Sequence, residues 1–138
     1  MTGRNIHDEM GDKIRAMSYG GIGAIHNMVR KIGLDKEIDT HLKLLKVHDP
    51  YHESDHVLNL AHNTLVGGLR LKDIELRRHD EVFMGALGAR RIPDPTTAGD
   101  FTRRFESKDN EMLLDSIHCS RQKVWSKAPR GTLEEALT

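Results

Sequence analysis

Apolar side chains recur every three or four positions through most of the chain, which is the period of an amphipathic α-helix. The clearest run covers residues 22–32 and ends at Gly33, and a second run starts directly after it and continues to Pro50. Acidic residues gather at the start of this second run, as the helix dipole favours. Its apolar face consists of Ile38, Leu42 and Leu45. The pattern predicts two consecutive helices, the second of which reaches the proline.

Beyond Pro50 the same spacing predicts four shorter helices, each bounded by a cap residue, glycine or proline. The expected ranges are 54–66 with Ser54 as N-cap, 72–79, 80–87 between Asp80 and Gly88, and 96–105 with Thr96 or Thr97 as N-cap. Residues 90–95 contain two prolines and are therefore expected to be extended, because a residue before proline avoids the helical region.

The last predicted helix is long, covering about residues 109–128, and is ended by Pro129 and Gly131. Its apolar and small positions step by four, three and four residues, a heptad-like stripe that needs a partner. The stripe consists of Leu113, Ile117, Ser120 and Val124. No strand-like alternation precedes Thr132. The predicted fold is all-α, an irregular multi-helix bundle with short connections and a long C-terminal helix.

The two ends of the chain carry weaker patterns. Residues 1–17 are mostly polar, and their apolar positions Ile6, Met10 and Ile14 permit a weak amphipathic helix as readily as a frayed leader. We expect a poorly ordered leader at 1–17, a helical domain at 18–131 and a tail at 132–138.

Composition narrows the class of protein. A length of 138 residues fits one domain, and 21 Lys and Arg balance 21 Asp and Glu. Zero net charge removes the simplest argument for a nucleic-acid or membrane partner, although it allows a local basic patch.

The longest run of apolar or small residues, 82–89, is far shorter than the roughly 18–20 residues of a membrane span. The single cysteine, Cys119, suits a reducing cytoplasm. We therefore expect a soluble cytoplasmic protein.

Metal and nucleophile chemistry find little support in the sequence. Four histidines lie close together with Glu53 and Asp55, namely His48, His52, His56 and His62. Pro50 interrupts the helix that would align the first two, so surface histidines are favoured over a metal site and none is expected. Cys119 is interpreted as a buried small side chain. The glycines at 20–23 lack the preceding strand and the spacing of a dinucleotide fingerprint.

Basic side chains are more suggestive. Residues 70–108 hold nine Lys or Arg beside seven Asp or Glu. Asp100 and Arg104 stand in the favourable acid-first i, i+4 order and are predicted to pair, which leaves Arg103 without a local partner. Two short helices carrying an arginine pair could present one to a DNA groove, but residues 88–95 are longer than the turn of a helix-turn-helix motif.

Three stretches of the chain, in their order and spacing, resemble the N-terminal region of DDE-type transposases from bacterial insertion sequences. They read YHESDHVLNL from Tyr51, GGLRLKDIELRRHDE from Gly67, and LGARRIPDPTTAGDFTRRF from Leu87. The opening SYGGIG at 18–23 and the Val124-Trp125 pair resemble the same group, so the likeness covers roughly residues 18–137.

The resemblance implies a parent enzyme that cuts and joins DNA at the terminal inverted repeats of a mobile element. In that family an RNase H-like domain follows, whose three carboxylates hold two divalent metal ions such as magnesium. Its first carboxylate belongs to an Asp-x-Asp-Gly-Thr strand, and no Asp-Gly-Thr occurs in this chain. We therefore expect a truncated or fragmentary transposase that is inactive alone, with no catalytic residue and no cofactor of its own.

The expected role in DNA binding leads to one hypothesis about which residues contact the DNA. The residues expected to contact phosphates, positioning the duplex rather than reading its bases, are Arg90, Arg91, Arg103 and Arg104. Three other interpretations stay open: a helical module that pairs with full-length transposase, or with itself, through the stripe of the last helix; a small DNA-binding regulator; and a relic without function.

Overall fold

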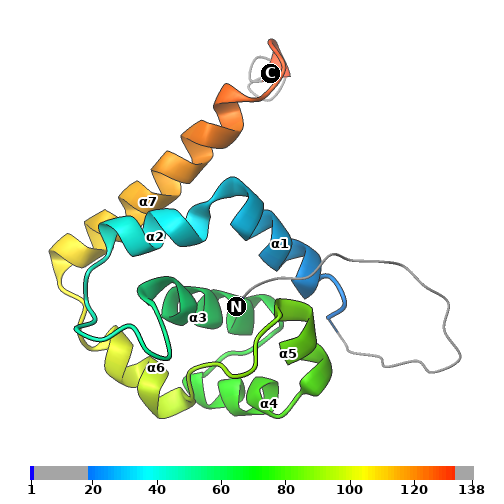
Figure 1. The fold of residues 1–138 in the computed structure, drawn as a ribbon, viewed down its shortest axis with the longest axis vertical. Coiled ribbons are helices and arrows are strands. Elements are labelled where there is room, and N and C mark those ends of the chain that lie inside the picture. The colour runs from blue at the N-terminus through cyan, green and yellow to red at the C-terminus, as the bar shows by residue number, and fades with distance from the viewer. Residues whose placement is uncertain (2–18, 133–138) are drawn as a thin grey trace, which may run out of the picture.

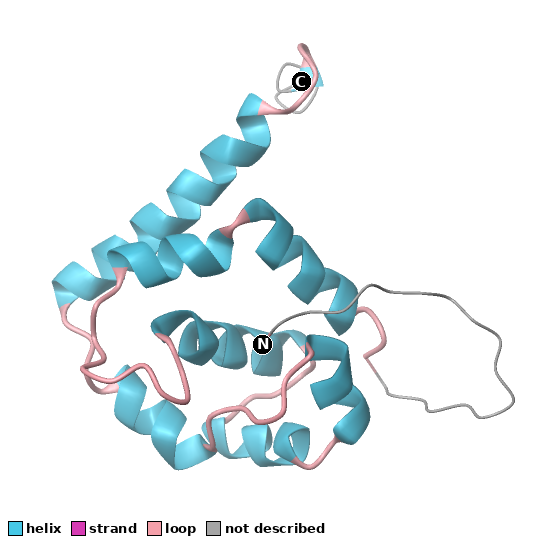
Figure 2. Cartoon of the chain, in the orientation of Figure 1, coloured by secondary structure: helices cyan, strands magenta, loops and turns pink. Residues whose placement is uncertain are grey.

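The computed structural model describes Met1 and residues 19–132 and is all-α within them (Figure 2). Its helices are α1 (Ile22–Ile32), α2 (Leu34–His41), α3 (Glu53–Leu65), the 3-10 turn η1 (Leu71–Asp73), α4 (Ile74–Arg78), α5 (Glu81–Leu87), α6 (Pro95–Thr102) and α7 (Ser107–Ser126). The predicted helical class and the long last helix are confirmed. The expected leader, apart from Met1, and residues 133–138 of the expected tail lie outside the described residues.

Helices α3 to α6 form a compact body, and α1 and α2 lie along one side of it (Figure 1). Helix α7 runs beside α2 and then projects beyond the body as an arm (Figure 1). None of the described helices is long and apolar enough to cross a membrane.

The apolar interior is divided into two small clusters. The larger joins α1, α4, α5 and α6 to the end of α3 and consists of Ile22, Val66, Ile74, Phe83, Met84, Leu87, Ile92 and Ala98. The smaller cluster, Ile38, Leu42 and Phe101, joins α2 to α6 and is flanked by Leu113 of α7. Because, among the described residues, the second cluster alone connects α7 to the apolar interior, the arm is held by few buried side chains.

Helix α2 is shorter than predicted. It ends at His41, and Leu42 is already extended, with φ −94° and ψ 122°. The Oε1 atom of Glu53 accepts hydrogen bonds from the backbone N–H groups of Leu44 and Leu45 at 3.1 and 3.0 Å. These amides are therefore satisfied outside a helix, so the chain can leave α2 early while Leu42 stays fully buried. Burial disfavours the charge of Glu53, yet the Leu45 N–H and His48 hold the pKa of its carboxyl below the usual value.

Two predicted N-caps are corrected. Helix α3 begins after His52, whose N–H donates to Asp55 Oδ2 at 3.0 Å. Ser54 lies inside the first turn and binds Asp39 instead, through its N–H at 2.8 Å and its hydroxyl at 2.9 Å. Helix α6 is capped by Asp94 rather than by a threonine, because Pro95 supplies a first residue that lacks an N–H group. Asp80 and Gly88 bound α5 as predicted.

The buried side of α7 differs from the predicted stripe. It consists of Asp109, Ser116 and Ser120, with Leu113 partly buried. Ile117 and Val124 are exposed instead, with 37% and 44% of their surfaces accessible. The reason is that α7 meets α2 through a close polar contact, the Ser116 hydroxyl donating to the Glu37 carbonyl at 3.2 Å. Small side chains permit this approach, and the larger apolar ones are turned outwards.

Candidate functional site

Arg90 and Arg91 lie on the extended segment between α5 and α6, as the prolines predicted. The segment is anchored by the side-chain amide of Asn59, which donates to the Pro93 carbonyl at 3.1 Å. Ile92 and Pro93 are buried beside this anchor. The two preceding arginines are therefore directed outwards and are both exposed.

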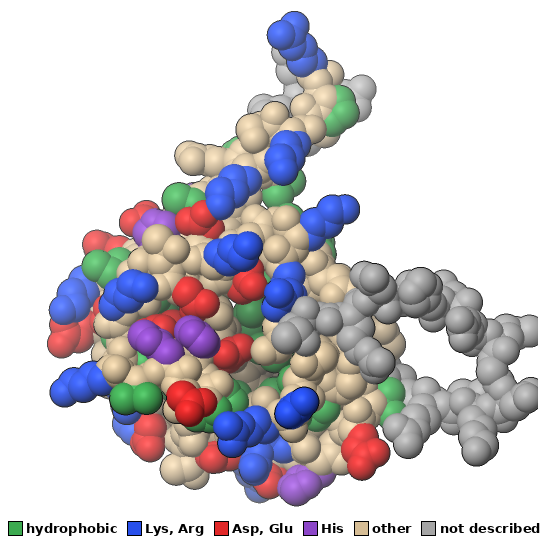
Figure 3. Space-filling view, in the orientation of Figure 1, with side chains coloured by type: hydrophobic (Ala, Val, Ile, Leu, Met, Phe, Trp, Pro, Cys, Tyr) green, Lys and Arg blue, Asp and Glu red, His purple; other side chains and the backbone are tan. Residues whose placement is uncertain are grey.

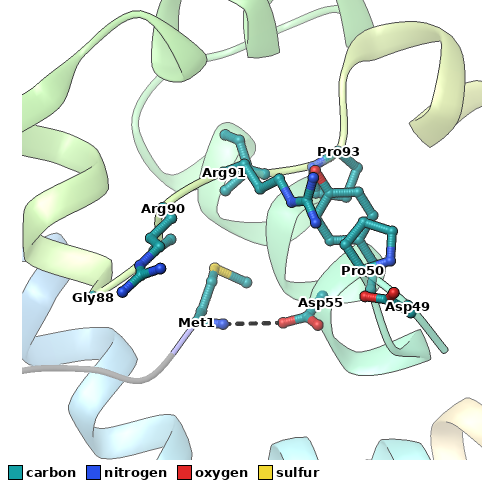
Figure 4. Close-up of a pocket in the computed structure, with 11 residues that line it drawn as sticks. Met1, Asp49, Pro50, Asp55, Gly88, Arg90, Arg91 and Pro93 are labelled. Atoms are coloured by element: carbon teal, nitrogen blue, oxygen red, sulfur yellow. Dashed lines mark hydrogen bonds and ion pairs between the residues drawn. The ribbon is translucent and has the colours of Figure 1, made fainter.

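These two arginines line a small pocket of about 220 Å³ between the segment and the start of α3. Figure 4 shows Arg90 on the Met1 side of the pocket and Arg91 directed towards Pro50 and Asp49. The Met1 ammonium is paired with Asp55 Oδ1 at 3.2 Å. The pocket therefore contains carboxylates as well as guanidinium groups, and its charge is mixed.

Arg103 and Arg104 lie elsewhere, at the end of α6. The predicted pairing is wrong, because Asp100 forms its ion pair with Arg103 at i, i+3 and not with Arg104. Arg104 lines a separate groove of about 360 Å³ that shares no residue with the pocket of Arg90 and Arg91. We call this the α6–α7 groove, lined by Lys43, Leu44, Lys46, Arg104, Glu106, Lys108 and Asp109. The four arginines of the hypothesis thus occupy two surfaces rather than one.

Another basic surface was missed by the sequence analysis. It is a groove of about 530 Å³ where the α1–α2 corner meets the arm of α7, and five of its nine lining residues are Lys or Arg with no Asp or Glu. We call it the α1–α7 notch, lined by Arg30, Lys31, Ile32, Gly33, Lys36, Lys123, Val124, Ser126 and Lys127. Figure 3 shows Lys and Arg side chains along the arm and over the α1–α2 corner.

The notch has a local structural cause. Arg30 and Lys31 occupy the last turn of α1, and Lys123 occupies the last turn of α7, where cations complement the helix dipole. Gly33 takes φ 77° between α1 and α2, a left-handed conformation that lets the chain reverse at once. This reversal brings α2 against α7, so cations from opposite ends of the sequence line one groove. No sequence pattern links them.

Charge within the notch is only partly compensated. Lys123 pairs with Glu37, and Arg30 donates to the Met1 carbonyl at 2.7 Å. Within the part of the chain that the structure describes, Lys31, Lys36 and Lys127 have no ion pair. The notch therefore presents uncompensated positive charge in a concave surface, which favours an anionic partner.

The four clustered histidines do not form one site. His48 and His52 stack on each other at the surface, with ring centroids 5.3 Å apart. His56 is buried and stacks on Phe101 at 4.3 Å, and His62 is buried against His26. The prediction of surface histidines is therefore wrong for His56 and His62. Desolvation by burial lowers the pKa of both, that of His62 to about 4.

A different set of metal-ligand types meets between α2 and α7. Glu37, His41 and Cys119 each place one ligand atom within 4.8 Å of the other two. Cys119 is half-buried rather than buried, so its thiol is not the enclosed small side chain that the sequence suggested. This cluster is separate from the histidines considered in the sequence.

No family model, curated protein or solved structure matches the chain. What the protein does is therefore inferred from its own residues and surfaces. Two basic surfaces among the described residues, the α6–α7 groove and the α1–α7 notch, favour the binding of a polyanion, and the lining of the notch contains no acidic residue.

Proposed function

We propose that this protein is the helical N-terminal region of a DDE-type transposase and that it binds the DNA ends of its element in the bacterial cytoplasm. The three resembling stretches support the family, and the α1–α7 notch is the observation that carries the DNA role. Five cations line the notch, and three of them, Lys31, Lys36 and Lys127, have no ion pair among the described residues, which suits the closely spaced phosphates of a duplex.

The contacts proposed for the notch are phosphate contacts. Lys31, Lys36 and Lys127 approach from three different helix ends, so a duplex backbone lying across the groove would meet all of them. Such contacts fix the position of the duplex but carry no sequence information. Arg90 and Arg91, on the other side of α3, are retained as a second proposed contact, since both are exposed.

The catalytic step is assigned to the part of the parent family that carries its three carboxylates. None of that family's Asp-Gly-Thr signature occurs in these 138 residues. We therefore propose DNA-end binding and assembly of the paired-end complex for this region, and no strand cleavage by the 138 residues alone.

Fluorescence anisotropy of the element's terminal repeat, compared with a scrambled duplex across a salt series, tests the proposal. Lys31→Ala combined with Lys127→Ala should weaken binding to both duplexes and reduce the salt slope by about two, because each substitution removes one cation from a phosphate. Lys72→Ala is the matched control, because Lys72 is an exposed lysine on η1 outside the notch. An unchanged affinity and slope in the double variant would refute the notch as the contact surface.

A second candidate function is a helical interaction module that pairs with full-length transposase. Its support is the row of exposed apolar side chains on α7, Leu114, Ile117, Val124 and Trp125. Co-purification with the full-length enzyme in the absence of DNA tests it. Ile117→Glu should abolish the pairing, whereas Leu69→Glu, at an exposed leucine outside α7, should not. DNA binding without any such pairing would leave only the first proposal.

A further inference from the structure

Three side chains of metal-ligand type converge where α7 crosses α2. Glu37 and His41 stand one turn apart on α2, and Cys119 approaches from α7. One ligand atom of each lies within 4.8 Å of the others, and all three residues are half-buried. This convergence of a carboxylate, an imidazole and a thiol is a different kind of site from the phosphate contacts proposed above, although Glu37 pairs with Lys123 of the notch.

The orientation of His41 leaves one ring nitrogen available. Its Nδ1 lies 2.8 Å from the Glu37 carbonyl oxygen, and because a carbonyl can only accept, Nδ1 carries the hydrogen. In the neutral ring the lone pair is then on Nε2. Metal-ligating histidines are usually fixed in this way, with the second nitrogen donating to a carbonyl or carboxylate.

The two carboxylate oxygens of Glu37 contact different side chains. Its Oε1 accepts from the Lys123 ammonium, which anchors the charged form. Its Oε2 lies on the His41 side, 3.6 Å from Nδ1. One oxygen is therefore held by the arm, and the other lies beside the imidazole ring of His41.

Ser116 lies one turn before Cys119 on α7 and fixes the position of this part of the helix against α2. The Ser116 hydroxyl lies 3.2 Å from the Glu37 carbonyl and 3.0 Å from the Met112 carbonyl. The Glu37 carbonyl accepts from His41 Nδ1 and also lies within hydrogen-bond distance of the Ser116 hydroxyl, whose single hydrogen is shared between this carbonyl and that of Met112. This shared acceptor fixes α7 against the turn of α2 that carries the two other ligands.

We propose that Glu37, His41 and Cys119 form a Zn²⁺ site that joins α7 to α2. Thiolate, imidazole and carboxylate are the ligands that zinc uses, and three protein ligands leave a fourth position for water. Ligand atoms around tetrahedral zinc are about 3.3–3.8 Å apart, given bonds of roughly 2.0–2.3 Å. The ligand atoms, which lie within 4.8 Å of one another, would therefore have to approach by at most about 1.0–1.5 Å when zinc binds. Binding releases the thiol proton of Cys119 to solvent, so the affinity rises with pH.

Cobalt substitution tests this site directly. Because Cys119 is the only cysteine in the chain, a thiolate-to-Co²⁺ charge-transfer band reports this residue and not the nine histidines. We expect the band to saturate at one Co²⁺ per chain and to disappear when Zn²⁺ is added. His41→Gln and Glu37→Gln should each weaken Co²⁺ binding at least tenfold. His118→Gln, at the exposed histidine next to Cys119, is the matched control and should leave the band unchanged.

A second measurement needs no variant of the site. Stoichiometric Zn²⁺ should slow alkylation of the Cys119 thiol in the wild-type protein at least tenfold, and a chelator should restore the rate. The proposal is overturned if stoichiometric Co²⁺ gives no thiolate band, if a folded His41→Gln protein binds Co²⁺ as tightly as the wild type, or if Zn²⁺ leaves the alkylation rate unchanged. A band that appears only with two chains per Co²⁺ would also overturn it, since Cys119 would then be bridging molecules.

Discussion

His26 Nδ1 lies 3.0 Å from His62 Nε2 inside the body, and both side chains are about 1% exposed. His26 Nε2 faces the Met1 carbonyl at 3.3 Å and must donate to it, so Nδ1 of the neutral ring accepts from His62. The remaining nitrogen, His62 Nδ1, is buried without a hydrogen-bond partner among the described residues. Protonating His62 would place an N–H group where it has no acceptor. Desolvation by burial accordingly lowers the pKa of His62 to about 4, and that of His26 below 6.5.

Stability should therefore fall in mild acid. The unfolded chain protonates His62 near pH 6.5 and the folded chain only near pH 4, so stability is full above 6.5 and is lost as the pH falls towards 4. The loss from His62 reaches about 3 kcal/mol, since each unit of pKa shift corresponds to about 1.4 kcal/mol. Urea unfolding at neutral pH and near pH 5 measures the first part of this loss, about 2 kcal/mol. His62→Gln should flatten the dependence, and His79→Gln, at an exposed histidine, should not.

Leu42→Ala should destabilise the protein by about 3 kcal/mol, the usual cost of truncating a buried leucine. Leu42 is fully buried and contributes to the smaller apolar cluster that connects α2, α6 and α7. Leu69→Ala is the control, because Leu69 is 92% exposed and its truncation should change the unfolding free energy by less than about 0.5 kcal/mol. Equal denaturant midpoints for the two variants would contradict the assigned core.

Asp94→Ala should cost about 1 kcal/mol by removing the N-cap of α6. The Asp94 carboxylate accepts from the Thr97 N–H at 2.8 Å and from the Thr97 hydroxyl at 3.0 Å. Asp94→Asn keeps a capping oxygen and should restore most of the stability in thermal or denaturant unfolding. If the alanine and asparagine variants unfold at the same midpoint, the capping assignment fails.

Gly68→Ala should destabilise the protein by about 2 kcal/mol through overpacking. A Cβ at this position would overlap the side-chain amide of Asn63, which donates to the Arg70 carbonyl at 3.2 Å. Gly20→Ala is the matched control, because a Cβ there meets no atom within 4 Å. Thermal melts of the two alanine variants should separate clearly, and coincident melts would show that the α3–η1 turn has room for a methyl group.

Arg104→Ala should weaken DNA binding more than Arg103→Ala does. The guanidinium of Arg103 is already paired with Asp100, whereas Arg104 lines the α6–α7 groove beside Lys43 and Lys46. Removing one phosphate-binding cation lowers the slope of log K against log salt by about one. Anisotropy titrations at several salt concentrations compare the two variants, and an equal weakening in both would show that the ion pair opens on binding.

Local sequence signals determined most of the secondary structure. The period of apolar residues indicated the helical class, Gly33 ended α1, Asp80 and Gly88 bounded α5, and Pro93 and Pro95 kept the preceding segment extended. Each of these signals acts within about one turn of the residue concerned, so the sequence alone is sufficient. The exposure of Arg90 and Arg91 follows from the same segment.

Only the tertiary structure decided where helices stop and which faces meet. Glu53, at the start of α3, accepts hydrogen bonds from two backbone amides of the segment after α2, and these bonds between neighbouring elements override the helical period of Leu42 and Leu45. Because the Ser116 hydroxyl lies against the Glu37 carbonyl, the face of α7 that carries Ser116 is buried and Ile117 is exposed. Both the α1–α7 notch and the cluster of Glu37, His41 and Cys119 arise from this packing. Their residues come from distant parts of the chain, and pattern alone carries no information about which distant segments touch.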